Sequence, residues 1–311
     1  MAEVATLASP SKLKANPENP RLIFHEEELR DLEDSIGKQG ILVPLSVYAE
    51  GKHYVLLDGE RRWRCATKLG LKTVPVLVQP KPGKLQNIMM MFAIHNAQKD
   101  WDPLPTAMKL EELEAILTKR HGRKPTEREL AELASLAIGV LRRLKKLIKL
   151  PQSYRDELMK ELKKPRSKQV VKVDHVLEIT RGAAALRKRG VLHDEQEEET
   201  LKQALIAKVR SKVIANTVEP RRLPRMARAV ERNEVTVEAV RRIIGRLMKE
   251  PRYSIEQAFK DSVEEADNQH VTLQAAQRLT ERIEYHMKER YETTPELRAT
   301  LRALRQILQQ F

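Results

Sequence analysis

The sequence predicts an α+β fold, in which a small N-terminal α/β domain precedes mainly α-helical domains. Short β-branched runs bounded by turn residues cluster within the first hundred positions. The later chain is rich in Leu, Ala, Arg and Glu, and only 4% of all residues are aromatic whereas 33% are charged. At 311 residues the chain exceeds the ~100–200 residues of a typical domain, so we expect two or three compact units.

The N-terminal domain is predicted to contain alternating strands and helices. The expected strands are Val43–Tyr48, Tyr54–Leu57 and Val74–Val78, with a turn at Ala49–Lys52 between the first two. The expected helices run roughly over Glu26–Gln39 and Arg61–Leu69, and they end at Gly40 and Gly70.

Composition changes divide the chain into four segments. The stretch Gln79–Gly83 breaks regular structure, and Asp102-Pro103 is typical of a helix start, so a boundary is expected near Trp101. The predicted segments are a flexible tail at 1–12, a small sheet domain at 13–100, a helical domain at 101–168 and a helical C-terminal region at 169–311.

The charge balance favours a polyanionic partner. Lys and Arg number 58 against 44 Asp and Glu, a net charge of +14, and phosphate-rich nucleic acid attracts such a surface. The longest apolar run, Ile88–Ile94, is far shorter than the ~18 residues needed to span a bilayer. The lone Cys65 cannot form an internal disulfide, and the first residues lack the pattern of a secretory signal. A cytoplasmic protein that does not bind membranes is expected.

The most informative string for chemistry is Asp58-Gly59-Glu60-Arg61-Arg62-Trp63-Arg64, which leaves a strand and enters a helix. Glycine allows backbone amides to approach an anion, and the helix N-terminus adds partial positive charge. Guanidinium groups form charge-assisted, forked bonds to phosphate oxygens. The pattern therefore suits a phosphate site, although a solvated basic helix start would have the same composition.

Four ordered motifs resemble those of ParB-type partition proteins. Gly59–Arg64 is similar to the GERRxR signature of that family. The other three are Asn16–Arg21, similar to an NPxQPR box, Ser35–Pro44, similar to SIxxxGIxxP, and His95–Lys99, similar to ENxQR. The resemblance covers about residues 10–165, and the C-terminal half is not recognised.

The resemblance implies a ParB/sulfiredoxin-like nucleotide-binding domain followed by a helix-turn-helix domain. Proteins of this family bind CTP with Mg²⁺ and load onto DNA, and two protomers close into a DNA clamp that slow hydrolysis reopens. The implied partners are double-stranded DNA, a second copy in a homodimer and a ParA-like ATPase. The implied role is chromosome partition, plasmid segregation or nucleoid organisation, with a cytoplasmic location on the nucleoid or a plasmid.

The family's site residues carry over to matching positions of this chain. The nucleotide-binding positions implied are Arg21, Gly59, Glu60, Arg61, Arg62, Arg64, Asn96 and Lys99. The metal positions implied are Asn96 and His95. No catalytic residue is assigned.

Departures from the motifs bear on turnover. His95 replaces a glutamate, Asn19 a glutamine and Lys99 an arginine. A carboxylate suits Mg²⁺ whereas imidazole is a poor ligand for it, so the sequence supports nucleotide binding more directly than a slow CTPase activity. His95 could equally be a packing residue. Cys65 stands where alanine is usual, and a small buried side chain explains it better than redox chemistry.

A helix-turn-helix is predicted between Thr126 and Pro151. Thr126 and Glu129 match a capping box for a helix through Ala134, and a second helix is expected over Ile138–Leu150. The second helix has an apolar face of Val140, Leu141, Leu144, Leu147 and Ile148. Its opposite face carries the candidate DNA-binding residues Arg142, Arg143, Lys145, Lys146 and Lys149.

Two features leave open whether the predicted helix-turn-helix recognises a specific DNA sequence. Ser135 stands where the turn glycine is usual, and Leu136–Gly139 makes the start of the second helix unusually apolar. A solvated basic face is the alternative to a DNA-binding one.

The C-terminal region offers two weaker signals. One is a set of arginines with three- or four-residue spacing, which fits either nonspecific duplex binding or a charged surface: Arg221, Arg222, Arg225, Arg228, Arg232, Arg241, Arg242 and Arg246. The other is a four-three repeat of Leu297, Leu301, Leu304, Leu308 and Phe311. The repeat fits an ordinary core-facing helix or, alternatively, self-association.

Other function classes remain as alternatives. One is a nucleotide-gated adaptor or transcription regulator with weak or no sequence-specific DNA reading, which the irregular second helix favours. A ParB-like nuclease is less well supported, because no paired-carboxylate cluster surrounds the glycine-arginine motif. A sulfiredoxin-like reductase would need a cysteine in the phosphate loop, whereas Cys65 lies within the helix.

Overall fold

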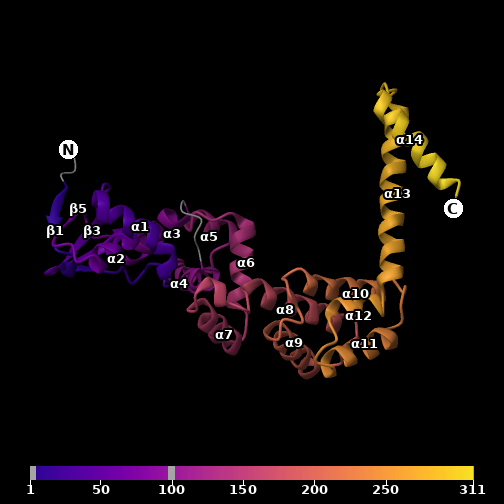
Figure 1. Cartoon of the computed structure of the whole chain (residues 1–311), viewed down its shortest axis with the longest axis horizontal. Helices are drawn as coiled ribbons and strands as arrows, with labels where there is room; N and C mark the ends of the chain where they lie inside the picture. The colour runs from indigo at the N-terminus through magenta and orange to yellow at the C-terminus, as the bar shows by residue number, and fades with distance from the viewer. Residues whose placement is uncertain (1–4, 97–101, 311) are drawn as a thin grey trace. The chain divides into compact units, whose positions relative to one another are not determined.

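The N-terminal part of the chain folds around a five-stranded sheet. The computed structural model describes residues 5–96 and 102–310 (Figure 1). The strands lie in the order β1-β5-β3-β4-β2. Their bounds are β1 Thr6–Ala8, β2 Leu13–Lys14, β3 Leu45–Glu50, β4 His53–Asp58 and β5 Val74–Gln79. The fold class and the three predicted strands are confirmed.

The two short strands were not predicted from the sequence. β1 pairs antiparallel with β5, and β2 pairs parallel with β4. Part of the segment predicted as a flexible tail, 1–12, is therefore an edge strand, followed by the 3-10 turn Pro10–Lys12. Strands of two or three residues are too short to show an alternating pattern, so only pairing with longer strands reveals them.

Helices cover both faces of the sheet. On one face Leu45, Val47 and Leu56 form a core with Ala66 of α2, which spans Glu60–Lys68. On the other face Val55 and Leu57 pack with Met91 of α3, which spans Lys84–Asn96. Because successive strand residues point to opposite faces, the run Val55-Leu56-Leu57 serves both cores. Helix α1 spans Glu26–Gln39 and ends at Gly40, as predicted.

Four helices follow the sheet domain. Their bounds are α4 Pro103–His121, α5 Glu127–Leu133, α6 Ile138–Ile148 and α7 Gln152–Leu162. Asp102 is the N-cap residue of α4 with Pro103 at its first position, and Thr126 and Glu129 form the predicted capping box of α5. Ser135 takes a left-handed φ of 52° in the turn between α5 and α6, where glycine is usual.

The remaining chain is helical. After the 3-10 turn Arg166–Lys168 come α8 Val173–Lys188, α9 Glu195–Arg210, the 3-10 turn Glu219–Arg221, α10 Arg222–Glu231, α11 Val237–Lys249, α12 Ile255–Lys260, α13 Glu264–Lys288 and α14 Pro295–Leu308. None of the described helices is both long enough and apolar enough to cross a membrane.

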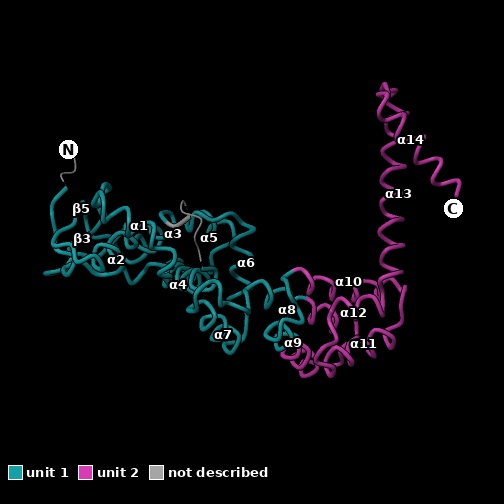
Figure 2. Tube along the Cα trace, viewed as in Figure 1, with its two compact units in different colours: residues 1–181, 205–217 teal, residues 182–204, 218–311 magenta. Residues whose placement is uncertain are grey.

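The chain divides into two compact units (Figure 2). The first comprises residues 1–181 and 205–217, and the second comprises residues 182–204 and 218–311. The boundaries expected near Trp101 and after residue 168 both fall within the first unit. The structural division falls later, within α8, because the N-terminal part of α8 and the end of α9 pack with the preceding helices.

In the second unit, arginines of the C-terminal set hold α13 in place. Asp267 of α13 is only 4% exposed. Its carboxylate accepts from Arg225 Nε at 3.0 Å and lies 3.7 Å from Arg232 Nη2. Arg241 donates to the carbonyl oxygens of Gly190 and Val191. Several of these arginines thus have intramolecular partners, which favours the charged-surface interpretation over duplex binding for them.

Helix α14 buries none of its residues within the described chain. Leu297, Leu301 and Leu304 are half-buried, and Leu308 is 60% exposed. The interpretation of this repeat as an ordinary core-facing helix is therefore wrong, because none of the described leucines is fully buried. Phe311 lies outside the described residues.

Candidate functional site: an arginine-lined cavity and a basic helix

The turn from β4 into α2 builds the centre of the site. Gly59 takes a φ of 93° as the N-cap residue of α2. A Cβ at this position would lie 2.5 Å from Leu45 Cδ2 and 3.1 Å from Arg62 Nη2. Only glycine fits both this backbone conformation and this packing. The first turn of α2 therefore faces the space beside the sheet.

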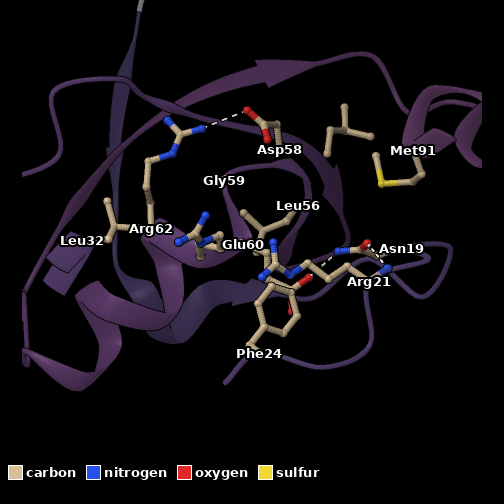
Figure 3. A pocket seen from close by; sticks show the side chains of 12 residues that line it. Asn19, Arg21, Phe24, Leu32, Leu56, Asp58, Gly59, Glu60, Arg62 and Met91 are labelled. Atoms are coloured by element: carbon tan, nitrogen blue, oxygen red, sulfur yellow. Dashed lines mark hydrogen bonds and ion pairs between the residues drawn. The ribbon is translucent and has the colours of Figure 1, made fainter. Parts of the chain in front are cut away.

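A cavity of about 350 Å³ lies beside this turn (Figure 3). It is lined by Asn19, Arg21, Phe24, Leu32, Leu56, Leu57, Asp58, Gly59, Glu60, Arg61, Arg62 and Met91. Three arginines and the N-terminus of α2 therefore line the same cavity, together with apolar side chains. Such a combination suits a ligand with an anionic end and a less polar end.

The cavity's arginines are held by carboxylates and carbonyl oxygens. Arg62 Nη2 lies 2.8 Å from Asp58 Oδ2, and its Nη1 donates to the Pro44 carbonyl at 3.0 Å. Arg21 Nη2 lies 2.9 Å from Glu28 Oε2. Arg61 Nη2 donates to the Glu28 backbone oxygen at 2.7 Å. The guanidinium groups are therefore positioned before any ligand is bound.

Glu60 joins the first motif to the helix. Its Oε2 accepts from Asn19 Nδ2 at 2.8 Å, and its Oε1 accepts from Arg64 Nη2 at 2.6 Å. Asn19 Oδ1 in turn accepts from the Arg21 backbone N–H at 2.8 Å. Asn19 is buried, so its amide fixes the loop that carries Arg21. The residue that departs from the family motif thus has a defined positioning role.

Two arginines stack on one aromatic ring. Arg64 Cζ lies 4.2 Å and Arg21 Cζ 5.0 Å from the ring centroid of Phe24. Cation–π contacts of this kind fix the guanidinium planes. Phe24 was not predicted as a site residue, and an aromatic residue three positions after the first motif was the only sequence signal for it.

The structure brings together five of the predicted nucleotide-binding residues at this cavity: Arg21, Gly59, Glu60, Arg61 and Arg62. Arg64 does not line the cavity; its guanidinium pairs with Glu60 and stacks on Phe24. Lys99 and the side chains of His95 and Asn96 lie outside the described residues. Among the residues whose placement is described, no group of three His, Cys, Asp or Glu side chains could hold a metal ion.

Helix α6 carries the second predicted site. Leu141, Leu144 and Leu147 are buried, as predicted, whereas Val140 is 47% exposed. The expectation that Val140 packs with them is wrong, because the buried stripe begins one position later. Ile138 is also 41% exposed, so the start of the helix presents apolar side chains to solvent.

The basic residues of α6 have different environments. Arg142 Nε lies 2.8 Å from Glu127, and Arg143 Nη2 lies 2.7 Å from Asp174. Lys145 is only 20% exposed and lies 3.1 Å from Glu114, so it serves an internal ion pair. Lys146 and Lys149 are exposed and form no ion pair within the described part of the chain. The open basic face therefore consists of four residues and not five.

Comparison with known proteins gives a match to the N-terminal part. The ParB N-terminal domain family matches residues 1–95. The chromosome-partitioning protein ParB of Caulobacter vibrioides is 46% identical over 70 residues, 22% of this chain and 23% of that protein. The chromosome-partitioning protein Spo0J of Thermus thermophilus is 32% identical over 142 residues, 45% of this chain and 49% of that protein.

Among solved structures, the chain is similar to the C-terminally truncated chromosome-partitioning protein ParB of Caulobacter crescentus complexed with CTP-gamma-S. It is 31% identical, with 50% of this chain and 85% of that chain covered at a TM-score of 0.29. The chain thus spans between about a quarter and a half of the length of the curated relatives named above. Both the ordered motifs and the sheet with its glycine-arginine turn agree with the match of residues 1–95 to the ParB N-terminal domain family.

Proposed function

We propose that this chain is a ParB-like, CTP-dependent DNA-binding protein that acts as a DNA clamp or switch in plasmid or chromosome partition or in nucleoid organisation. The observation that carries the proposal is the cavity in which Arg21, Arg61 and Arg62 surround the N-terminus of α2. This arrangement lies within the segment that matches the ParB N-terminal domain family. The choice of CTP over other nucleotides rests on the family resemblance.

A triphosphate would enter by exchanging partners with the carboxylates. Arg62 and Arg21 now contact Asp58 and Glu28, and phosphate oxygens offer the same guanidinium groups equally good acceptors. The first-turn N–H groups of α2, which follow Gly59, would add donors to the same phosphates. Binding would therefore free one or both carboxylates from their arginines.

The described residues fit the phosphates better than they fit Mg²⁺. Asp58, Glu28 and Glu60 each contact an arginine, so none presents an unpaired carboxylate to a cation. Mg²⁺ is commonly bound through one or two carboxylates together with substrate phosphates, so it would arrive with the nucleotide. Asn96 and His95 remain the proposed metal positions, and hydrolysis is not part of this proposal.

Duplex DNA would bind along α6. Arg142, Arg143, Lys146 and Lys149 form its open basic face, and a helix of this kind enters the major groove in helix-turn-helix proteins. The further parts of the proposal are a homodimer formed through α14, a ParA-like ATPase as partner, and a cytoplasmic location on the nucleoid or a plasmid. The unburied leucines of α14 support the homodimer.

The decisive experiment is calorimetric titration of the protein with CTP, ATP, GTP and UTP in the presence of Mg²⁺, with and without duplex DNA. We expect selective CTP binding that DNA strengthens. Arg62→Gln should lose at least tenfold in CTP affinity, since one charge-assisted contact contributes on the order of 1.5–3 kcal/mol.

Arg30→Gln provides the matched control. Arg30 is exposed on α1 and does not line the cavity, so this variant should bind CTP like the wild type. Equal affinity of the wild type and Arg62→Gln for CTP, or no nucleotide binding by either, would contradict the proposed function.

The second candidate is an adaptor or transcription regulator that reads DNA weakly or not at all. The observation in its favour is the exposed apolar pair Ile138 and Val140 at the start of α6, where base-contacting polar side chains are usual. Competition between one labelled duplex and unlabelled duplexes of varied sequence separates the two, because a specific reader prefers some competitors strongly.

A further inference from the structure

A hollow of about 630 Å³ lies within the first unit, away from the nucleotide cavity. The connection before α8 forms one wall, with Lys168 and Lys172, and the turn after α9 forms the other, with Lys212. No Asp or Glu is among its described lining residues. The three lysines are exposed and form no ion pair within the part of the chain that the structure describes. The hollow is therefore strongly electropositive.

A buried histidine adds a further polar group to the lining. His175 also lines the hollow, and it is only 4% exposed. Its Nδ1 accepts from the Lys172 backbone N–H at 3.1 Å, which leaves the proton of the neutral ring on Nε2. Burial, followed by the charge of Lys172, lowers the pKa of His175, and the Asn216 backbone partly opposes this.

The His175 ring interacts with the Asn216 backbone, and its Nε2 forms no hydrogen bond of standard geometry among the described residues. A better-placed acceptor on a bound ligand would complete the hydrogen bonding of this buried donor. Helix α8 begins beside His175 at Val173, so its N-terminus adds further positive potential to the same space. Lysines, an N–H donor and a helix N-terminus together suit an anion with several acceptor oxygens, which is a phosphate group.

We propose that this hollow binds a backbone phosphate of duplex DNA and so extends the DNA contact beyond α6. This inference rests on the DNA binding proposed above. Arg143 of α6 contacts Asp174 in the first turn of α8 at 2.7 Å. Lys172 lines both the hollow and a neighbouring one that Arg143 also lines. Asp102 and Asp174 also line that neighbouring hollow, so basic side chains lie on both sides of Asp174, those of α6 on one side and the lysines of the larger hollow on the other.

The test measures duplex affinity of the full chain as a function of salt concentration. The triple variant Lys168→Gln, Lys172→Gln and Lys212→Gln should bind less tightly than the wild type. The slope of log affinity against log salt should flatten by about 0.9, the value for one lost phosphate contact. The control variant Lys38→Gln, Lys52→Gln and Lys72→Gln removes the same charge from exposed positions of the sheet domain and should leave the slope unchanged.

Imidazole nitrogen NMR of His175 supplies a second readout. Adding duplex should shift the Nε2 resonance in the wild type and not in the triple variant, while circular dichroism shows that both are folded. A shift with inorganic phosphate or CTP but none with duplex would identify a free-anion site and overturn the DNA assignment. If the wild type binds duplex and the triple variant keeps its slope, the hollow is not used although the proposed function stands. If the wild type binds no duplex, both fail.

Discussion

At single positions of the N-terminal site, the local structure limits which residue type can be present. Gly59 must combine a left-handed φ with a wall of Leu45 2.5 Å from the position a Cβ would take. Asn19 replaces a longer family residue, yet its amide reaches both Glu60 and the Arg21 backbone. The site therefore depends as much on residues that position the arginines as on the arginines themselves.

Replacing Gly59 by alanine should destabilise the first unit and disturb the arginine-lined cavity. The left-handed conformation alone costs an L-residue about 1–2 kcal/mol, and the contact with Leu45 adds to it. Urea unfolding followed by circular dichroism measures the loss. Gly83→Ala is the control, because nothing lies within 4 Å of its added Cβ and its φ is not positive. Equal stability of the two variants would contradict the assigned role of Gly59.

Cys65 has a structural role. Its side chain is 1% exposed, and its Sγ–H points to the Leu29 carbonyl at 3.8 Å. Burial, followed by the charge of Glu33, raises the pKa of the thiol. Because the thiolate is the reactive form, these surroundings disfavour redox chemistry, in agreement with the sequence expectation.

Among the elements, α5 has the clearest link between sequence and stability. Glu129 accepts from Arg123, from the Thr126 backbone and from the Thr126 hydroxyl. These bonds, that to Arg123 first, lower the pKa of Glu129 from its ordinary 4.5 to about 2. The folded state therefore binds its proton less readily than the unfolded chain does.

The sign of the resulting pH dependence follows from this shift. The stabilisation by Glu129 is fully present above its ordinary pKa of 4.5 and is lost as pH falls through about 2. Glu129→Gln should therefore lower the melting temperature at about pH 7 and have little effect near the acid end of this window. Thermal unfolding at both values measures the difference. Glu132→Gln on the same helix, whose carboxylate accepts from Arg128 Nε, should show a smaller pH-dependent change; equal changes would refute the capping assignment.

Helices α13 and α14, at the end of the second unit, carry apolar side chains that are not buried in a core. Asp267 fixes the start of α13 through Arg225 and Arg232, whereas further along this helix Leu273 is 56% and Met287 74% exposed. In α14 the leucine repeat is likewise unburied. Apolar side chains in this arrangement are typical of a surface that pairs with another chain.

For the whole molecule, we predict a homodimer that depends on α14. Replacing Leu301 and Leu304 by lysine should convert a dimer to a monomer, because each charge would be buried in the seam between two copies. Light scattering coupled to gel filtration measures the mass, and unchanged helicity would show that each chain remains folded. Arg302→Ala and Arg305→Ala form the control, since these residues are exposed beside the same seam. A wild-type monomer, or a dimeric leucine variant, would contradict this prediction.

The sequence by itself determined the elements whose signals are local. Gly40, Gly59 and the capping pair Thr126 and Glu129 depend on neighbours within one or two turns, so their helices were predictable from the chain alone. The glycine-arginine motif likewise predicted where Arg61 and Arg62 would lie, because the strand, the turn and the helix are consecutive.

The tertiary structure decided everything that depends on partners distant in sequence. In the sequence, Lys145 and Arg64 resemble ligand-binding residues. In the folded chain, Lys145 forms an ion pair with Glu114, whereas Arg64 pairs with Glu60 and stacks on Phe24. The C-terminal arginines were ambiguous until Asp267 was seen between two of them. The hollow beside His175 joins segments about forty residues apart. Helical periodicity specifies the face on which a charge lies, whereas the nearest opposite charge depends on how elements pack, and that packing determines which charges stay available to a ligand.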